Sequence, residues 1–399
     1  MTQTKLRNGL ILLIGALGIF QPLALDPYLP NVSAIATDLN VEPSLIAQNL
    51  TFLTLGVSVG LVVAGPMSDA IGRRRPVLLA LLGFAAASFA TAFATSYEVF
   101  FALRAAQGFF AACAAVVANA MLRDLYQGLQ LIKAIARSML LLGTTWFLGP
   151  IFGSVLQSFT DWRGLGSLLA ATSLLLLAVV YWKLPDTMSL EDRTKSSAKD
   201  VITGFGRLLK DRVFLGLVLI QMTISITLYG YLSISTFIYD NAFGIGALQV
   251  GFILATNSAS SYVGVQIGAA LSRIFKPQFV LLGTLILGVA SGAMMIVVAV
   301  MQLPFLVFTV TMALFVMSFG TSITPLLGLA MDSHPHEAGT AAAVITFSGT
   351  FAATLAGPLY AVLDHESSMG LGVAIVGFLA LGIFFLFTIV RPKQLEVMK

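Results

Sequence analysis

The sequence predicts an all-α integral membrane protein with twelve transmembrane helices, and three observations support this fold class. The 399 residues are 58% hydrophobic and only 10% charged, whereas soluble domains are about a quarter charged. Nearly all of the chain falls into apolar runs of about 20 residues, which is the length that a membrane-spanning helix needs. The basic residues gather in alternate breaks between these runs.

Breaks rich in charge, proline or glycine divide the chain into six runs in each half. The expected spans of the first half are 9–37, 44–68, 76–95, 98–121, 132–158 and 164–184. Those of the second half are 212–238, 246–271, 277–300, 303–330, 338–362 and 369–390. We therefore predict an N-terminal six-helix bundle over 1–184, a cytoplasmic linker over 185–210 and a C-terminal six-helix bundle over 211–399.

The distribution of basic residues predicts the orientation. Because the number of spans is even, both termini lie on one side, and Lys and Arg concentrate on the cytoplasmic side of membrane proteins. Of the 22 Lys and Arg, only Arg104 and Arg163 fall away from the side of the termini. Both termini are therefore expected in the cytoplasm. The net charge of +4 has the same origin, since no basic patch with interleaved aromatics indicates nucleic-acid binding.

Two sequence echoes indicate that the halves are duplicated. Residues 65–79 have a weaker echo in residues 268–282, which begins 203 positions later. Gly149-Pro150 in the fifth span matches Gly357-Pro358 in the eleventh, 208 positions later. Duplicated, pseudo-symmetric bundles with a substrate site between them at mid-membrane are typical of transporters that work by alternating access. A channel has less need of two such halves.

Asp26 in the first span and Arg104 in the fourth are the exceptions in spans that otherwise lack ionisable side chains. A charge inside the membrane costs about 2.5–3.5 kcal/mol on insertion scales, and such residues are usually functional. Arg104 keeps its proton under all ordinary conditions, so Asp26 is the candidate proton carrier of this pair. A permanent salt bridge between the two helices is the alternative. Pro27 and Pro30 favour a mobile, hydrated segment over such a clamp.

The loop after the second span carries glycines and charges in a pattern suited to a sharp turn. Gly72 permits the turn, and the three arginines that follow are expected to anchor the loop at the anionic inner surface. A purely topological role is the alternative. The residues that we assign to this loop cluster, with two from the end of the fourth span, are Gly65, Asp69, Gly72, Arg73, Arg74, Arg123 and Asp124.

The fifth span carries small residues around a proline. Gly143, Gly149 and Gly153 allow helix backbones to approach closely, and Pro150 removes a backbone hydrogen bond and bends the helix. Packing alone is the alternative interpretation of this pattern.

Four motifs resemble those of the major facilitator superfamily, and within it those of the twelve-helix drug:proton antiporters of the bicyclomycin and chloramphenicol resistance group. They are Gly65-Pro-Met-Ser-Asp69-Ala-Ile-Gly72-Arg73-Arg74-Arg75-Pro, Leu103-Arg104-Ala-Ala-Gln107-Gly108, Gly143-Thr-Thr-Trp-Phe-Leu-Gly149-Pro150-Ile-Phe-Gly153 and Asp26-Pro-Tyr28-Leu29-Pro30. Ser154 stands where a second glycine is common. The resemblance spans the whole chain.

The resemblance implies a proton-coupled antiporter that exports amphipathic drugs, chloramphenicol-like or bicyclomycin-like, across the inner membrane of a bacterium. It also implies a latch, in which Asp69 meets the positive N-terminal end of helix 11 near Gly339 and holds the inner side shut. The glycine and proline motif of the fifth span is expected to seal a helix interface, which prevents transport that is not coupled to the proton.

Neutral polar side chains in the spans suit an apolar substrate with a few polar atoms. For any one of them, packing between helices is the alternative. The second-half spans contain no deep carboxylate, so proton handling is expected in the first half. The residues that we place around the substrate cavity are Asp26, Tyr28, Gln107, Tyr229, Thr236 and Asn257.

Other functions fit the residues less well. A metabolite exporter or a proton-coupled uptake transporter of the same fold is the main alternative. No nucleotide-binding glycine loop is present, which excludes an ATP-driven pump. The spans also lack the reactive side chains that an enzyme would need. We expect no cofactor beyond the proton gradient, no metal site, and a monomer whose partners are the drug, protons and the lipid bilayer. Cys113 is a single cysteine in an apolar run, and His334, His336 and His365 lie in loops without a visible carboxylate partner, so none of them indicates a metal site.

Overall fold

The computed structural model describes residues 3–42, 45–46, 48–188, 193, 198–360 and 368–392. Regular structure in this part of the chain is helical throughout, as the fold class predicts. Ten helical stretches within it are long and apolar enough to cross a membrane. The other two long helices are α6 (Arg74–Thr91), which opens on arginines, and α12 (Ala247–Ile274), which carries several polar side chains. Together they account for the twelve predicted spans.

The chain forms two compact units, which comprise Met1–Glu42 with Phe52–Ile202 and Pro43–Thr51 with Thr203–Lys399. The helices of the first half are α1 (Gln3–Gly18), α2 (Phe20–Leu25), η1 (Asp26–Asn31), α3 (Val32–Asp38), α5 (Asn49–Ile71), α6, α7 (Tyr97–Leu125), α8 (Gly128–Gln157) and α9 (Trp162–Lys183). Those of the second half are α11 (Arg212–Phe243), α12, α13 (Pro277–Met301), α14 (Phe305–Asp332), η2 (Pro335–Glu337), α15 (Ala338–Tyr360), α16 (Ser368–Phe385) and the π-helical η3 (Leu386–Val390).

A further helix, α10 (Ala198–Leu208), lies within the predicted linker of residues 185–210. Its Arg207 forms an ion pair with Glu337 of η2 at 2.7 Å. The segment is therefore not only a connection between the halves, because its second part has helical structure and a partner of its own.

The first span is broken, whereas the sequence predicts one helix over residues 9–37. The α-helix stops after Leu25, and η1 continues as a 3₁₀-helix before α3 resumes the α-helical path. Pro27 and Pro30 cause this change, because proline has no N–H to donate along an α-helix. The break places Asp26 at a junction between two helix types.

Capping residues decide where several spans begin and end. Asp161 accepts from the backbone N–H groups of Arg163 and Gly164 and starts α9, and Asp211 accepts from Phe214 and starts α11. These caps satisfy backbone donors that have no partner within the helix. Gly244, with a φ of +63°, ends α11, so this helix runs beyond the predicted limit at residue 238.

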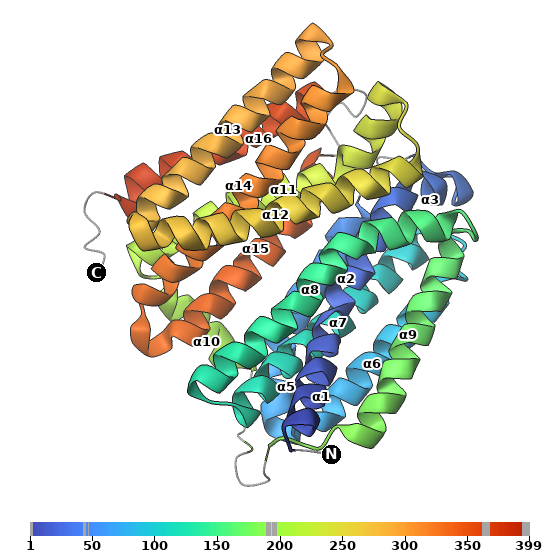
Figure 1. The fold of residues 1–399 in the computed structure, drawn as a ribbon, viewed down its shortest axis with the longest axis vertical. Coiled ribbons are helices and arrows are strands. Elements are labelled where there is room, and N and C mark those ends of the chain that lie inside the picture. The colour runs from blue at the N-terminus through green and yellow to red at the C-terminus, as the bar shows by residue number, and fades with distance from the viewer. Residues whose placement is uncertain are drawn as a thin grey trace. The chain divides into compact units, whose positions relative to one another are not determined.

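The two units repeat one pattern of helix pairing, as Figure 1 shows for each unit by itself. In the first, α6 packs against α7 and α9, while α1 packs against α7 and α8. In the second, α13 packs against α14 and α16, while α11 packs against α14 and α15. These are the same positions in each six-helix set. The common pairing confirms the pseudo-symmetric bundles predicted from the sequence echoes.

Candidate functional site

The first span holds a carboxyl group inside the first unit. Asp26 opens η1, and its backbone N–H donates to the carbonyl of Pro22 in α2. The residue is 9% exposed, and its Oδ2 atom is buried with no hydrogen-bond partner. Buried polar groups are nearly always hydrogen-bonded, and an exception indicates a special role or an absent ligand. Asp26 is such an exception.

Helix α8 packs directly on this segment through its motif glycines. A Cβ at Gly149 would lie 2.8 Å from the Cβ of Asp26, and one at Gly153 would collide with the carbonyl of Pro27. Asn31 joins the same contact, because its amide donates to Pro27 at 2.8 Å and to the carbonyl of Gly153 at 3.4 Å. The fifth span of the sequence therefore lies against the break in the first.

The remaining motif residues of the fifth span lie on the same helix. α8 runs without interruption through Pro150, which is buried. Gly143 lies six positions before Gly149 and is half-buried. Three large apolar side chains next to this face, Trp146, Phe147 and Leu148, are exposed. The glycine face of α8 is thus packed at this level, whereas these three neighbouring side chains are exposed.

Arg104 of α7 is fully buried and contacts the same 3₁₀ segment. Its guanidinium carbon lies 4.1 Å from the centre of the Tyr28 ring, and its Nη1 donates to Gln107 Oε1 at 2.8 Å. Gln107 in turn donates to the hydroxyl of Ser88 in α6 at 3.0 Å. Both ends of the Gln107 amide are therefore engaged in supporting Arg104. A cation over a desolvated aromatic ring is stabilised by about 2 kcal/mol.

Asp26 and Arg104 do not form an ion pair with each other in the described part of the chain. Arg104 reaches the η1 segment through Tyr28, two residues after Asp26. The structure therefore brings the two predicted residues to one segment and disfavours the alternative of a permanent salt bridge between them.

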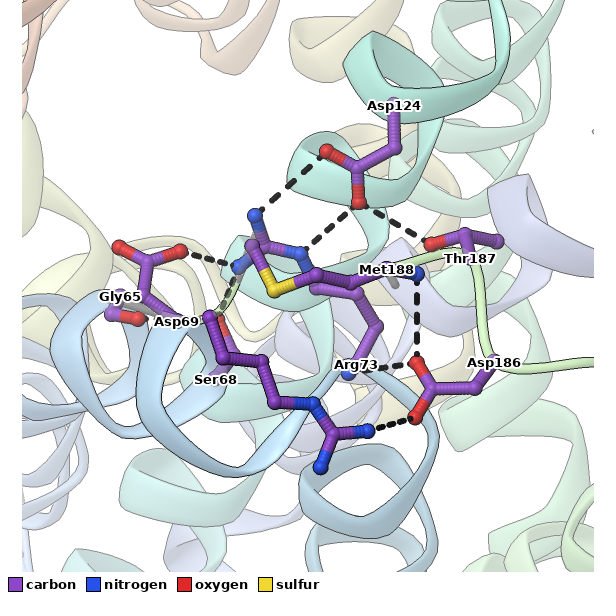
Figure 2. A network of polar contacts seen from close by, with 9 residues as sticks. Gly65, Ser68, Asp69, Arg73, Asp124, Asp186, Thr187 and Met188 are labelled. Carbon is purple, nitrogen blue, oxygen red and sulfur yellow. Dashed lines mark hydrogen bonds and ion pairs between the residues drawn. The ribbon is translucent and has the colours of Figure 1, made fainter. Parts of the chain in front are cut away.

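A second polar group surrounds Arg73, where α5 ends and α6 begins (Figure 2). Its guanidinium donates to Asp69 at 2.5 Å, to the Ser68 hydroxyl at 2.7 Å and to Asp124 of α7 at 2.9 Å. Burial lowers the pKa of Arg73, but hydrogen bonds to Asp124 and Asp69 outweigh this effect and raise the pKa. Arg73 therefore stays charged and holds the ends of three helices together.

Residues that follow α9 complete this group, as Figure 2 shows. Asp186 accepts from the backbone N–H of Arg73 at 3.0 Å and from Arg193 at 3.1 Å. Thr187 donates to Asp124 at 3.0 Å. We call Ser68, Asp69, Arg73, Asp124, Asp186 and Thr187 the Arg73 cluster. It links the ends of α5, α7 and α9 to the start of α6.

The other residues assigned to this loop lie around the Arg73 cluster. Gly72 has a φ of +88°, and an added Cβ would collide with Asp186, so the position requires glycine. Arg74 donates to the carbonyl of Tyr181 at 2.5 Å, the Gly65 carbonyl accepts from the Ser68 hydroxyl, and Arg123 is exposed.

The prediction that all three arginines anchor the loop at the membrane surface is wrong for Arg73. That side chain is 7% exposed, because the carboxylates of Asp69 and Asp124 draw it inward. Arg75 is exposed and remains suited to that role.

The opposite end of the first unit carries another charged group. Asp38, the last residue of α3, forms an ion pair with Arg163 and accepts from the indole N–H of Trp162 at 3.1 Å. Arg163 also donates to the carbonyl of Ala94 at 3.1 Å. These contacts tie the end of the broken first span to the start of α9.

Polar side chains of α11 and α12 meet inside the second unit. Asn257 donates to the hydroxyl of Tyr231 at 2.6 Å, and its Oδ1 atom is buried without a partner. Thr236 is buried and Tyr229 is half-buried, both on α11. The predicted cavity residue Asn257 thus contacts Tyr231 of α11.

Sequence reasoning missed several members of these groups, among them Asn31, Asp38, Ser88, Asp186 and Thr187. A signal for Asp186 was available, because the second and sixth spans end on the same side of the membrane. Its carboxylate follows directly after the sixth span. Asn31 offered a weaker signal, as an amide between Pro30 and an apolar run.

Two units of membrane-spanning helices with repeated pairing, a broken first helix and buried polar groups define a multi-pass membrane transporter. The sequence profile of the Major Facilitator Superfamily matches residues 12–358. The chain belongs to this superfamily.

Similar proteins agree with this assignment. The chain is 28% identical to the uncharacterized MFS-type transporter YdgK of Bacillus subtilis, over 94% of this chain and 95% of that protein. It is 27% identical to a bicyclomycin resistance protein homolog of Haemophilus influenzae, over 86% and 87%. It is 24% identical to the chloramphenicol resistance protein CraA of Acinetobacter baumannii, over 79% and 76%. A solved bacterial homolog of the lysosomal transporter Spinster shares the fold, with a TM-score of 0.77, 13% identity and 98% of each chain covered.

Proposed function

We propose that this protein is a proton-coupled antiporter that exports amphipathic drugs from the bacterial cytoplasm by alternating access. The observation that carries the proposal is the buried carboxyl group of Asp26, whose Oδ2 atom has no hydrogen-bond partner inside a membrane span. Ionisable groups within spans usually mark ion or proton pathways. Asp26 can gain and lose a proton at accessible pH, whereas Arg104 cannot.

Coupling follows from the surroundings of Asp26. Burial without a partner favours the neutral carboxyl group, while water in an open cavity, or the field of Arg104, favours the charged form. Alternation between these surroundings loads a proton on one side and releases it on the other. A pH difference of one unit supplies about 1.4 kcal/mol, and 100 mV supplies about 2.3 kcal/mol per charge. One proton therefore supports roughly a few-hundred-fold gradient of a neutral drug.

The names of similar proteins support export as the direction of transport and drugs as the substrate. Two similar proteins bear the names bicyclomycin resistance protein homolog and chloramphenicol resistance protein. Neutral polar groups such as Asn257 and Thr236 suit compounds of that chemistry. We propose no cofactor beyond the proton gradient, a monomer, and a site in the inner membrane with both termini in the cytoplasm. The latch role of Asp69 that the resemblance implies belongs to the same proposal.

The proposal is tested in proteoliposomes that hold the purified full-length chain. With an imposed pH gradient, the parent is expected to accumulate labelled chloramphenicol against its concentration gradient. Asp26→Asn is expected to lose this uphill transport and to keep downhill exchange of the label, because no group remains to carry the proton. Uphill transport by Asp26→Asn equal to the parent contradicts the role of Asp26. Accumulation in the direction of proton entry instead identifies a proton-coupled uptake transporter of the same fold, and coupled transport of metabolites without drugs identifies a metabolite exporter.

A further inference from the structure

The packing of α8 on η1 has no room for a side chain at two positions one helical turn apart. At Gly149 a Cβ would lie 2.8 Å from Asp26 Cβ and 3.4 Å from Oδ2. At Gly153 the new atom would collide with the backbone carbonyl of Pro27. Real Cβ atoms do not approach other heavy atoms this closely, so an alanine at either position displaces η1 or α8.

A side-chain hydrogen bond also joins the two segments. Asn31, one turn after Pro27 in η1, donates to the carbonyl groups of both Pro27 and Gly153. The bond to Gly153 joins η1 to α8, whereas the bond to Pro27 lies within η1. The unpartnered Oδ2 atom of Asp26 faces this contact.

We propose that Gly149 and Gly153 are positioning residues for Asp26, and that their close fit keeps its carboxyl group out of water. The inference rests on the proposed function, since it assigns to these two glycines of α8 a task at the proposed proton carrier. A displacement of α8 from η1 opens the contact and hydrates the carboxyl group. The glycine motif thereby couples the position of a helix to the protonation of one side chain.

Other charges do not explain such a coupling. η1 packs against α2, α3, α8 and α9, and α2 and residues 138–157 of α8 contain no titratable side chain. An alanine on this face of α8 therefore changes packing and hydration but adds or removes no charge. Besides Asp26, η1 contributes Tyr28, and α3 contributes Asp38, which forms an ion pair with Arg163 at the start of α9. Tyr181 and Lys183 lie at the far end of α9, and Arg104 of α7 reaches η1 through Tyr28.

The test measures the protonation of Asp26 directly, without a drug. Infrared difference spectra of the purified full-length protein are recorded across a pH series, and the carboxylic acid band that is lost in Asp26→Asn is assigned to Asp26. The variants are Gly149→Ala, Gly153→Ala and Asn31→Ala. The control is Gly377→Ala in α16, where an added Cβ meets no atom within 4 Å.

We expect the midpoint pH of the Asp26 band to fall by about one unit in Gly149→Ala, a tenfold shift toward the charged form, and to stay unchanged in Gly377→Ala. Gly153→Ala and Asn31→Ala are expected to shift it in the same direction. A midpoint that is unchanged in Gly149→Ala and Gly153→Ala overturns the inference. Asn31→Ala adds no atom, so an unchanged midpoint in this variant overturns it where the glycine variants do not fold.

This outcome is separate from that of the proposed function. If the glycine variants shift the Asp26 band but Asp26→Asn still drives uphill drug transport, the positioning role stands and Asp26 as transported-proton carrier fails. If Asp26→Asn abolishes uphill transport but the glycine variants leave the band in place, the proposed function stands and the positioning role fails.

Discussion

At the scale of single residues, the first unit shows how a membrane protein holds a buried cation away from a carboxylate. Arg104 is stabilised by the ring of Tyr28 and the amide of Gln107, and Asp26 is left with an unpartnered oxygen. An ion pair between the two would hold Asp26 charged. Stacking on Tyr28 keeps the cation near the same segment without this effect.

Tyr28 is accordingly expected to act through its ring. Tyr28→Phe keeps the aromatic face beneath Arg104 and should transport within about twofold of the parent. Tyr28→Leu removes about 2 kcal/mol of cation–π stabilisation and should lower transport tenfold or more. Rates of proton-driven chloramphenicol transport in proteoliposomes check both variants. Equal rates for Phe and Leu would show that only the volume of the side chain matters.

At the scale of elements, the Arg73 cluster joins helix ends that are far apart in the sequence. The loop between α5 and α6 meets Asp124 from α7 and Asp186 after α9. Arg73 is the buried charge of this cluster, and hydrogen bonds to charged groups contribute about 1.5–3 kcal/mol each. The cluster therefore fixes these ends as one body.

Arg73→Gln removes the charge at the centre of the cluster, while the matched variant Arg75→Gln removes an exposed charge two residues away. We expect Arg73→Gln to slow turnover at least tenfold with little change in drug affinity, because Asp124 of the cluster lies about 25 Å along α7 from the predicted cavity residue Gln107. Arg75→Gln should stay near the parent rate. Turnover in proteoliposomes and equilibrium binding of labelled chloramphenicol separate the two effects. Parent-like turnover of Arg73→Gln would leave the loop with a topological role only.

At the scale of the whole molecule, each unit repeats one set of helix pairs, yet the polar groups inside them differ. The first unit holds a carboxylate and a guanidinium, and the second holds the neutral pair Asn257 and Tyr231. A duplicated scaffold has thus diverged in its interior chemistry. This division fits the proposal that the first half handles the proton.

The orientation remains a prediction from the charge distribution, and Lys399 lies outside the described residues. A reporter that is active only in the periplasm should be silent when fused at Lys399. The same reporter inserted at Gln302, in the turn between α13 and α14, should be active. Activity at the terminus with silence at Gln302 would invert the topology.

The sequence alone predicted the fold class, the twelve spans, the duplication and the residues Asp26, Arg104 and Arg73. These features depend on apolar length, on charge placement and on repeated local patterns, all of which can be read along the chain. Helix limits were less accurate, because caps such as Gly244 and the 3₁₀ turn at Asp26 depend on backbone geometry.

Only the tertiary structure decided which of these residues contact one another. It placed Arg104 on Tyr28 instead of on Asp26, brought Asp186 to the backbone of Arg73, and set Gly149 against the carboxyl-bearing segment. Such contacts join side chains that are tens to more than a hundred residues apart. Their geometry arises from how helices cross and rotate when they pack, which no local pattern of polar and apolar residues specifies.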